Sequence, residues 1–517
     1  MKNNICKIMC AVILISLAIA QQSCKKDFAE INTNPNTSPY ALPQQLLAPA
    51  LVNTLSANML KARTFSNELV QYSVAETDGE GAVFRYDIRP NQADYMWNNL
   101  YVQLSNFKDI YKIASQPLTL NKGYQGISLI CQSWIYSILT DTYGDIPYFK
   151  SNLGRDSLIF EPQFDKQKDI YTDIFKQLET ANTLLTGATN VAGSSDPVFA
   201  GNCAQWRKFG NSLYLRLLLR LSGKAEVSAT VIAQIKKMID TSPGSYPIMT
   251  SNTDAAVLRW TGVGYLTSPF INGVREQDWR APSISSFFID NLNKWTDPRL
   301  YTQVSGSAGG VWSIAPSSGS FVGVPSGYSA GTAPTQRSYF YSTANGPGGK
   351  SYESEPLSGN IMNYAELQFI LAECAVKGYI SNVSAKTYYD NGVTNAITFW
   401  LPTYFATTNV PLVTTASYEA SAGLTWDDAA TLDAKMEAIH VQKYYTLFWT
   451  DFQEWFEVRR TNHPNLPKGP GVLNNKIMPA RLNYPIYVQS ANPVNYTAAV
   501  AGQGPDVIST QVWWQKP

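Results

Sequence analysis

Aromatic side chains in segments without helical periodicity are the first residues of this sequence that could do chemistry. The candidates stand in loop-like stretches: Phe84, Tyr86, Trp260, Tyr265, Trp312 and Tyr328. The apolar face of a sugar lies flat on an aromatic ring, and its hydroxyls take polar partners at the edge. Asp78 and Arg85 could supply such partners. We therefore expect these residues to bind a ligand through exposed rings, although each ring could instead anchor its own loop.

Residues for catalysis or metal binding are few. The chain has two histidines, His440 and His463, and this small number disfavours a histidine-based catalytic triad or metal cluster. The acid pairs Asp141 with Asp145 and Glu353 with Glu355 could resemble the two carboxylates of a glycosidase, but spacing in sequence does not give separation in space. For Asp141 and Asp145 we favour hydrogen bonds that form a corner. We expect no catalytic residue, no metal and no cofactor.

The composition favours an uncharged ligand. Formal net charge is +1, 15% of the residues are charged, and the chain holds 13 Trp and 30 Tyr. Because no basic run is present, nucleic acid and an anionic lipid surface are disfavoured as main partners. With 44% hydrophobic residues, the chain has ample material for a core.

The first residues are typical of a targeting segment. Lys2 and Lys7 precede the apolar run 8–20, which is too short to span a bilayer, and Cys24 follows it. We predict a signal peptide at residues 1–23, lipidation of Cys24 and a polar, flexible tether at 24–41. An ordinary secreted protein with an incidental cysteine is the alternative. Cys131, Cys203 and Cys374 are expected to be buried, inert thiols.

The body, residues 42–517, is predicted to be mainly α-helical. Apolar residues recur at helical spacing within 42–72, 97–113, 129–143, 170–185, 206–223, 229–239, 283–292, 362–378, 384–400 and 424–460. Loops are expected at 74–95, at 187–201 and after 464. A loop-rich part at about 241–360 is expected to be inserted between the helical regions and to serve binding, because long irregular spans are functional or mobile. Arg216 and Arg220, on the 206–223 helix, are expected to be solvated or capping.

We expect the chain to be organised around residues 129–149. Ile127, Ile130, Trp134 and Ile138 share one side of a helix, which Gly144 can end and Pro147 cannot continue. The segment that follows reads Asp-Thr-Tyr-Gly-Asp-Ile-Pro-Tyr from residue 141. We predict a fixed corner between helices there. Paired helices of this kind suggest tetratricopeptide-like units.

With these stretches the sequence resembles the SusD/RagB family of Bacteroidetes outer-membrane nutrient-binding lipoproteins. The matching stretches occur in the family's order: Cys24, 27–28, 31–36, 97–101, 141–148, 209–213, 297–300, 365–367 and 455–461. The resemblance implies a SusD-like helical scaffold with tetratricopeptide-like pairs and an irregular, ligand-binding part. It further implies a lipid-anchored protein, exposed at the cell surface, that passes an oligosaccharide or a peptide to a SusC-like TonB-dependent transporter.

Two other functions stay open from the sequence. A helical glycoside hydrolase would also combine helical scaffolding with abundant aromatic residues. A tetratricopeptide adaptor that binds protein segments would use the same helix pairs.

Overall fold

The computed structural model describes residues 41–76, 79–304 and 309–516. The predictions on the signal peptide, on Cys24, on nearly all of the tether and on Asp78 lie outside these residues. From Pro43 on, the described residues belong to one compact unit. It is mainly α-helical, as predicted. Among the described residues, no helix has the length and apolar character needed to cross a membrane.

Helices that pack against one another form the first half of the body. They are α3 (Pro43–Thr64), the short α4 (Ser66–Leu69), α5 (Asp94–Ala114), α6 (Lys122–Tyr143), the short α7 (Gly154–Ser157), α8 (Gln167–Leu185), α9 (Cys203–Leu221) and α10 (Ser228–Lys236). Helix α5 packs against α3 and α6, and α8 packs against α6 and α9. Side chains of Asn121 and Asn202 accept backbone N–H bonds at the starts of α6 and α9, which explains where these helices begin.

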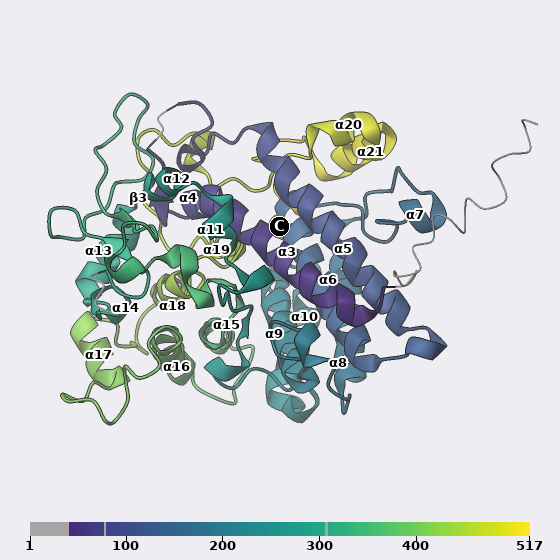
Figure 1. Ribbon diagram of the computed structural model, residues 1–517, viewed down its shortest axis with the longest axis horizontal. Helices are drawn as coiled ribbons and strands as arrows, with labels where there is room; N and C mark the ends of the chain where they lie inside the picture. Colours follow the sequence, from purple (N-terminus) through teal and green to yellow (C-terminus); the bar gives the residue numbers. More distant parts are fainter. Residues whose placement is uncertain (1–40, 77–78, 305–308, 517) are drawn as a thin grey trace, which may run out of the picture. The chain divides into compact units, whose positions relative to one another are not determined.

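A second group of helices follows the loop-rich part. It comprises α15 (Tyr364–Val376), α16 (Ala385–Thr398), α17 (Thr415–Ala422), α18 (Leu432–Thr446) and α19 (Gln453–Thr461). Helix α15 packs against α16 and α18, and it also touches α9 of the first group (Figure 1). Asn363 and Ser384 cap α15 and α16 in the same manner as the caps of the first group.

The predicted corner after α6 is present. Gly144 has a φ of 86°, a conformation that residues with a side chain rarely adopt, and this explains why glycine stands at this position. Asp141 is fully buried and accepts hydrogen bonds from Tyr171 Oη at 2.7 Å and Trp514 Nε1 at 2.8 Å. Asp145 accepts the Gln167 N–H at 2.9 Å, at the start of α8. The two aspartates therefore form the corner through hydrogen bonds, as favoured from the sequence.

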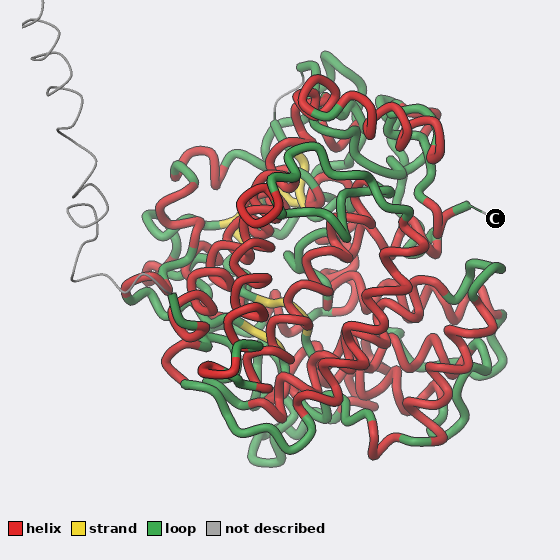
Figure 2. Tube along the Cα trace, turned by 90° about the vertical axis from the view of Figure 1, so that its right-hand side faces the viewer, coloured by secondary structure: helices red, strands yellow, loops and turns green. Residues whose placement is uncertain are grey.

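Short antiparallel strands hold the loop-rich part to the helices. One sheet has the order β1 (Ser73–Val74), β3 (Ser283–Ile284), β5 (Tyr339–Phe340) and β4 (Ile314–Ala315), and a second pairs β2 (Ala256–Val257) with β6 (Asn360–Met362). Along the chain, α11 (Pro269–Gly273) and α12 (Glu276–Arg280) lie between β2 and β3. Helices α13 (Ser286–Trp295) and α14 (Pro298–Tyr301) lie between β3 and β4. Figure 2 shows these strands as small yellow segments.

Three expectations about local structure were wrong. The 424–460 segment is broken between α18 and α19, where Trp449 and Asp451 have positive φ angles of 63° and 38°. The tail after residue 464 contains α20 (Ile486–Ala491) and α21 (Pro493–Gln503). Arg216 and Arg220 are buried, and they pair with acidic residues of other helices. The core thus contains ion pairs that helical periodicity does not reveal.

Candidate functional site

Five of the six predicted ligand-binding rings are buried. Phe84, Tyr86, Trp260, Trp312 and Tyr328 are each less than a tenth exposed, whereas Tyr265 is 60% exposed. The expectation that these loops hold out their rings was therefore wrong for five residues. Trp312 packs within an aromatic core, with its ring centroid 4.9 Å from that of Phe448. Whether any of the six contacts a ligand stays a prediction.

The structure brings two of the six rings, Phe84 and Tyr328, into contact. Phe84 and Tyr328 stack with ring centroids 4.8 Å apart, in a small apolar cluster with Val74, Ala82 and Val324. Tyr86 follows in the same turn, and burial raises its pKa to about 12. Trp260 and Tyr265 belong to a different loop, which precedes α11. The rings of the 83–86 turn are therefore packed inside the protein and are not exposed on its surface.

A pocket is lined in part by the segment that carries Phe84 and Tyr86, and we call it the loop pocket. Its volume is about 510 Å³, within the range of roughly 300–1,000 Å³ that small-ligand sites occupy. Three segments far apart in sequence line it, with the residues Gly79, Glu80, Arg85, Asp87, Ser329, Ala330, Gly471 and Leu473. Of these, sequence reasoning had singled out only Arg85.

Backbone hydrogen bonds join the three segments. The Gly471 N–H donates to Gly327 O at 2.8 Å, and the Leu473 N–H donates to Arg85 O at 2.8 Å. A Cβ at Gly471 would lie 2.2 Å from Tyr328 O, so the close approach of the two chains needs glycine there. A glycine in an otherwise loop-like tail is the one signal that could have pointed to this contact.

The polar groups of the loop pocket suit hydroxyl recognition. Arg85 is buried and donates from Nη2 to Gly79 O at 2.7 Å. Asp87 Oδ2 accepts the Gly81 N–H at 2.7 Å, and Arg89 bridges Asp87 and Glu80 at 3.2 and 3.1 Å. Carboxylate and guanidinium groups held in this way form strong hydrogen bonds to ligand hydroxyls, and Leu473 offers an apolar wall.

The acid pairs considered from the sequence are engaged in structural hydrogen bonds. Besides the bonds at the corner, Asp141 pairs with Arg220, and Asp145 pairs with Lys166 at 2.8 Å. Glu353 accepts the Thr343 N–H at 2.6 Å, and Glu355 pairs with Lys350 at 2.8 Å. All four carboxylates are buried. Each carboxylate therefore has hydrogen bonds or an ion pair within the protein that stabilise the fold.

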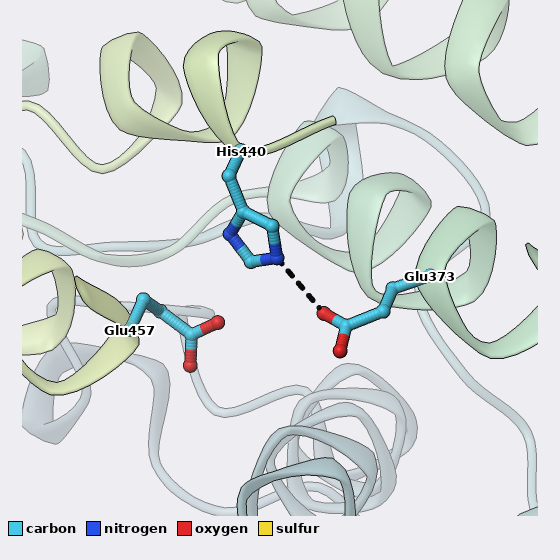
Figure 3. Close-up of side chains that lie close together, drawn as sticks. All are labelled: Glu373, His440 and Glu457. Atoms are coloured by element: carbon cyan, nitrogen blue, oxygen red, sulfur yellow. Dashed lines mark hydrogen bonds and ion pairs between the residues drawn. The ribbon is translucent and has the colours of Figure 1, made fainter. Parts of the chain in front are cut away.

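A buried group with metal-ligand side chains lies between α15, α18 and α19. Its members are Glu373, His440 and Glu457, whose ligand atoms lie within 4.8 Å of one another (Figure 3). Arg460 binds both oxygens of Glu373 at 2.6 Å, and Lys443 binds Glu457 at 2.8 Å. Burial favours the neutral acid, yet Arg460 holds the pKa of Glu373 and of Glu457 well below the usual range.

Protein cations thus occupy the positions that a metal would take in this group. Lys377 adds a further bond to Glu373 at 2.6 Å, and burial lowers the pKa of His440, which lies 3.1 Å from Glu373. A divalent ion would have to displace these cations and would be repelled by them. The group is an ion-pair network that joins three helices.

The comparisons with known proteins bear on this geometry. A family model described as "Starch-binding associating with outer membrane" matches residues 35–485. The chain belongs to the SusD-like family. The comparison with curated proteins gives no match.

Solved SusD-like structures share the fold of this chain. A chitin-binding SusD homolog from Flavobacterium johnsoniae is 22% identical, with 92% of this chain and 98% of that chain covered and a TM-score of 0.73. A SusD homolog from Bacteroides fragilis NCTC 9343 is 24% identical, with 92% and 100% covered and a TM-score of 0.74. Another, from Bacteroides uniformis ATCC 8492, is 22% identical, with 91% and 99% covered and a TM-score of 0.73. At such identities the likeness is one of fold.

Proposed function

We propose that this SusD-like protein binds an oligosaccharide at the loop pocket and delivers it to a SusC-like TonB-dependent transporter. The observation that carries the proposal is the family match, together with a pocket of suitable size and polarity in the irregular part. The family's description as starch-binding and the chitin-binding homolog with the same fold favour a glycan over a peptide. The protein acts by binding, and we assign it no catalytic step.

We also propose that the protein is held at the cell surface by fatty acids on Cys24. The apolar run 8–20 and the polar stretch after Cys24 support this assignment. A lipid anchor and a flexible tether would keep the ligand-loaded body beside a transporter in the same membrane. This raises the local concentration of one partner for the other without strong direct binding.

Affinity electrophoresis tests glycan binding at the loop pocket. The full-length protein, purified in detergent, is run in native gels that contain amylopectin, glycol chitin, xyloglucan or galactomannan. We expect one of these to retard the protein, and we expect Ala330→Trp to reduce the retardation because the indole fills the pocket. Ala330 is exposed, so the change does not disturb the core.

A matched pair of leucines controls for loss of apolar surface. Leu473 lines the pocket and is 52% exposed, whereas Leu412 is 54% exposed on another loop. Leu473→Ala should weaken retardation and Leu412→Ala should not. Equal retardation of wild type and Ala330→Trp would contradict the pocket assignment. Binding of peptides but of no glycan would favour an adaptor, and release of reducing sugar from the polymers would favour a hydrolase.

Co-purification tests the delivery step. A tagged copy of the protein, isolated from solubilised outer membranes, should bring down an intact TonB-dependent transporter. Isolation of the protein alone would count against the delivery step while leaving glycan binding untouched.

A further inference from the structure

A second pocket lies among helices, apart from the loop pocket. Its volume is about 290 Å³, and it shares no lining residue with the loop pocket. The lining comes from α5, α6, α8 and the corner that follows α6: Lys108, Tyr111, Leu129, Gln132, Ser133, Tyr136, Tyr148, Phe149, Asp173 and Gln177. We call it the helix pocket. A volume near the lower limit of small-ligand sites suits a single sugar residue rather than a long chain.

Aromatic rings form the floor and one rim of the helix pocket. Tyr136 and Tyr148 are buried, with ring centroids 4.3 Å apart. The ring of Phe149 stands at 90° to that of Tyr148 and is 53% exposed. Of these residues, sequence reasoning had considered only Tyr148, as part of the corner after α6, and Phe149, as the end of the stretch that contains it. An exposed phenylalanine packed against a buried tyrosine is a surface on which an apolar ligand face can rest.

Hydrogen bonds within the protein fix the floor in place. Tyr136 Oη and Ser151 Oγ lie 2.5 Å apart, and Lys108 Nζ donates to Ser151 O and Oγ at 3.0 and 2.9 Å. Tyr148 Oη donates to Asp173 Oδ2 at 2.8 Å. The rings and the two charged groups are therefore held in position before any ligand arrives, which lowers the entropy cost of binding.

Several polar groups of the helix pocket keep hydrogen-bonding capacity. Ser133 Oγ is buried and has no hydrogen-bond partner among the described residues. Asp173 Oδ1 and the amide oxygens of Gln132 and Gln177 accept no hydrogen bond from the described part of the chain, since the bonds of these side chains use Asp173 Oδ2 and the amide nitrogens. A ligand that donates several hydrogen bonds would satisfy the acceptors of Asp173, Gln132 and Gln177.

Charge selects among ligand classes. A cation would enter beside Lys108, whose ammonium already lies 5.5 Å from the centroid of the Tyr136 ring. An anion would face the Asp173 carboxylate. A neutral molecule with hydroxyl donors and one apolar face meets neither obstacle. From this geometry we propose that the helix pocket is a second carbohydrate site, which binds one residue of a neutral saccharide independently of the loop pocket.

Calorimetric titration with neutral trisaccharides tests the second site. The full-length protein in detergent is titrated with maltotriose, cellotriose, mannotriose and triacetylchitotriose. For at least one of them, binding should persist in Ala330→Trp, which fills the loop pocket. In that background Phe149→Ala should weaken binding by about three- to tenfold, because one ring contact is lost.

Phe160→Ala is the matched control, because Phe160 is 75% exposed and does not line the helix pocket. Gln132→Trp, at a half-buried position, gives a second variant that fills the helix pocket and should abolish the residual binding. Unchanged binding in both Phe149→Ala and Gln132→Trp overturns the proposal. The absence of any trisaccharide binding in Ala330→Trp also overturns the proposal. If wild type still binds in that case, the assignment of the loop pocket is unaffected.

Discussion

At the scale of single residues, burial decides what the aromatic side chains of this protein do. Trp312, Phe340 and Tyr352 come from the loop-rich part and pack on Phe448, with centroids 4.9 to 6.0 Å away. Loops with little regular backbone pairing gain most of their stability from such large apolar side chains. The same composition that suits sugar binding therefore serves a second purpose, which is to give an irregular segment its own core.

Ionisation of Glu68 lowers the stability of the folded protein. It is buried in α4, and burial raises its pKa to about 7, although the Phe84 backbone, Arg63 and Lys61 oppose the shift. Since this folded-state pKa lies above the ordinary value of 4.5, the folded state binds the proton more tightly than the unfolded state. The free energy of unfolding should therefore fall as pH rises from about 4.5 to about 7 and stay level above.

Glu68→Gln should remove that penalty. We expect the variant to be more stable than wild type at pH 8, by on the order of 1–3 kcal/mol, and the difference to vanish below pH 4.5. Urea unfolding at a series of pH values measures the stability difference and its dependence on pH. Glu161→Gln, at an exposed position, should leave the free energy of unfolding unchanged at every pH. A variant that is less stable than wild type at pH 8 would mean that the ionised Glu68 is stabilising.

At the scale of elements, buried ion pairs connect helices that are far apart in sequence. Arg216 of α9 donates to both oxygens of Glu366 of α15, at 2.6 and 2.7 Å, and to Ile361 O at 3.0 Å. Arg220 on the next turn binds Asp141 of α6 and Glu457 of α19. Helix α9 therefore links the first group of helices to the second through charge as well as apolar packing.

Breaking one of these pairs should cost far more than breaking an exposed one. Arg216→Ala leaves Glu366 buried without its partner and should lower the free energy of unfolding by about 3–5 kcal/mol. The double variant Arg216→Met with Glu366→Leu should recover most of that loss, because no charge remains buried. Urea unfolding measures the differences. Arg280→Ala breaks an exposed pair with Glu276 and should change stability by less than about 0.5 kcal/mol.

The break between α18 and α19 also depends on contacts with residues that are far away in the sequence. Trp449 adopts a φ of 63°, which costs a non-glycine residue about 1–3 kcal/mol. The turn directs the Trp449 ring towards Phe270 and Tyr352, with centroids 4.9 and 5.2 Å away. Burial of a large ring offsets the strain. A continuous helix through this segment would not place the ring in the core of the loop-rich part.

At the scale of the whole molecule, the proposed function depends on attachment to the membrane. Cys24→Ala should abolish metabolic labelling of the protein with a radioactive fatty acid and should release the protein from the membrane fraction. Cys131→Ala, at a buried position, is the control and should leave labelling unchanged. Labelling that persists in Cys24→Ala would refute the lipid anchor, and the folded body would then need another route to the outer membrane.

The sequence by itself determined the helical class, the family and the corner after α6, because periodicity, caps and turn residues act over a few neighbouring positions. It also indicated the role of Asp141 and Asp145 there. Only the tertiary structure decided which rings are buried, where α18 ends and what lines each pocket. The loop pocket joins Arg85, Ser329 and Gly471, and backbone bonds between segments hundreds of residues apart depend on packing that local sequence does not encode.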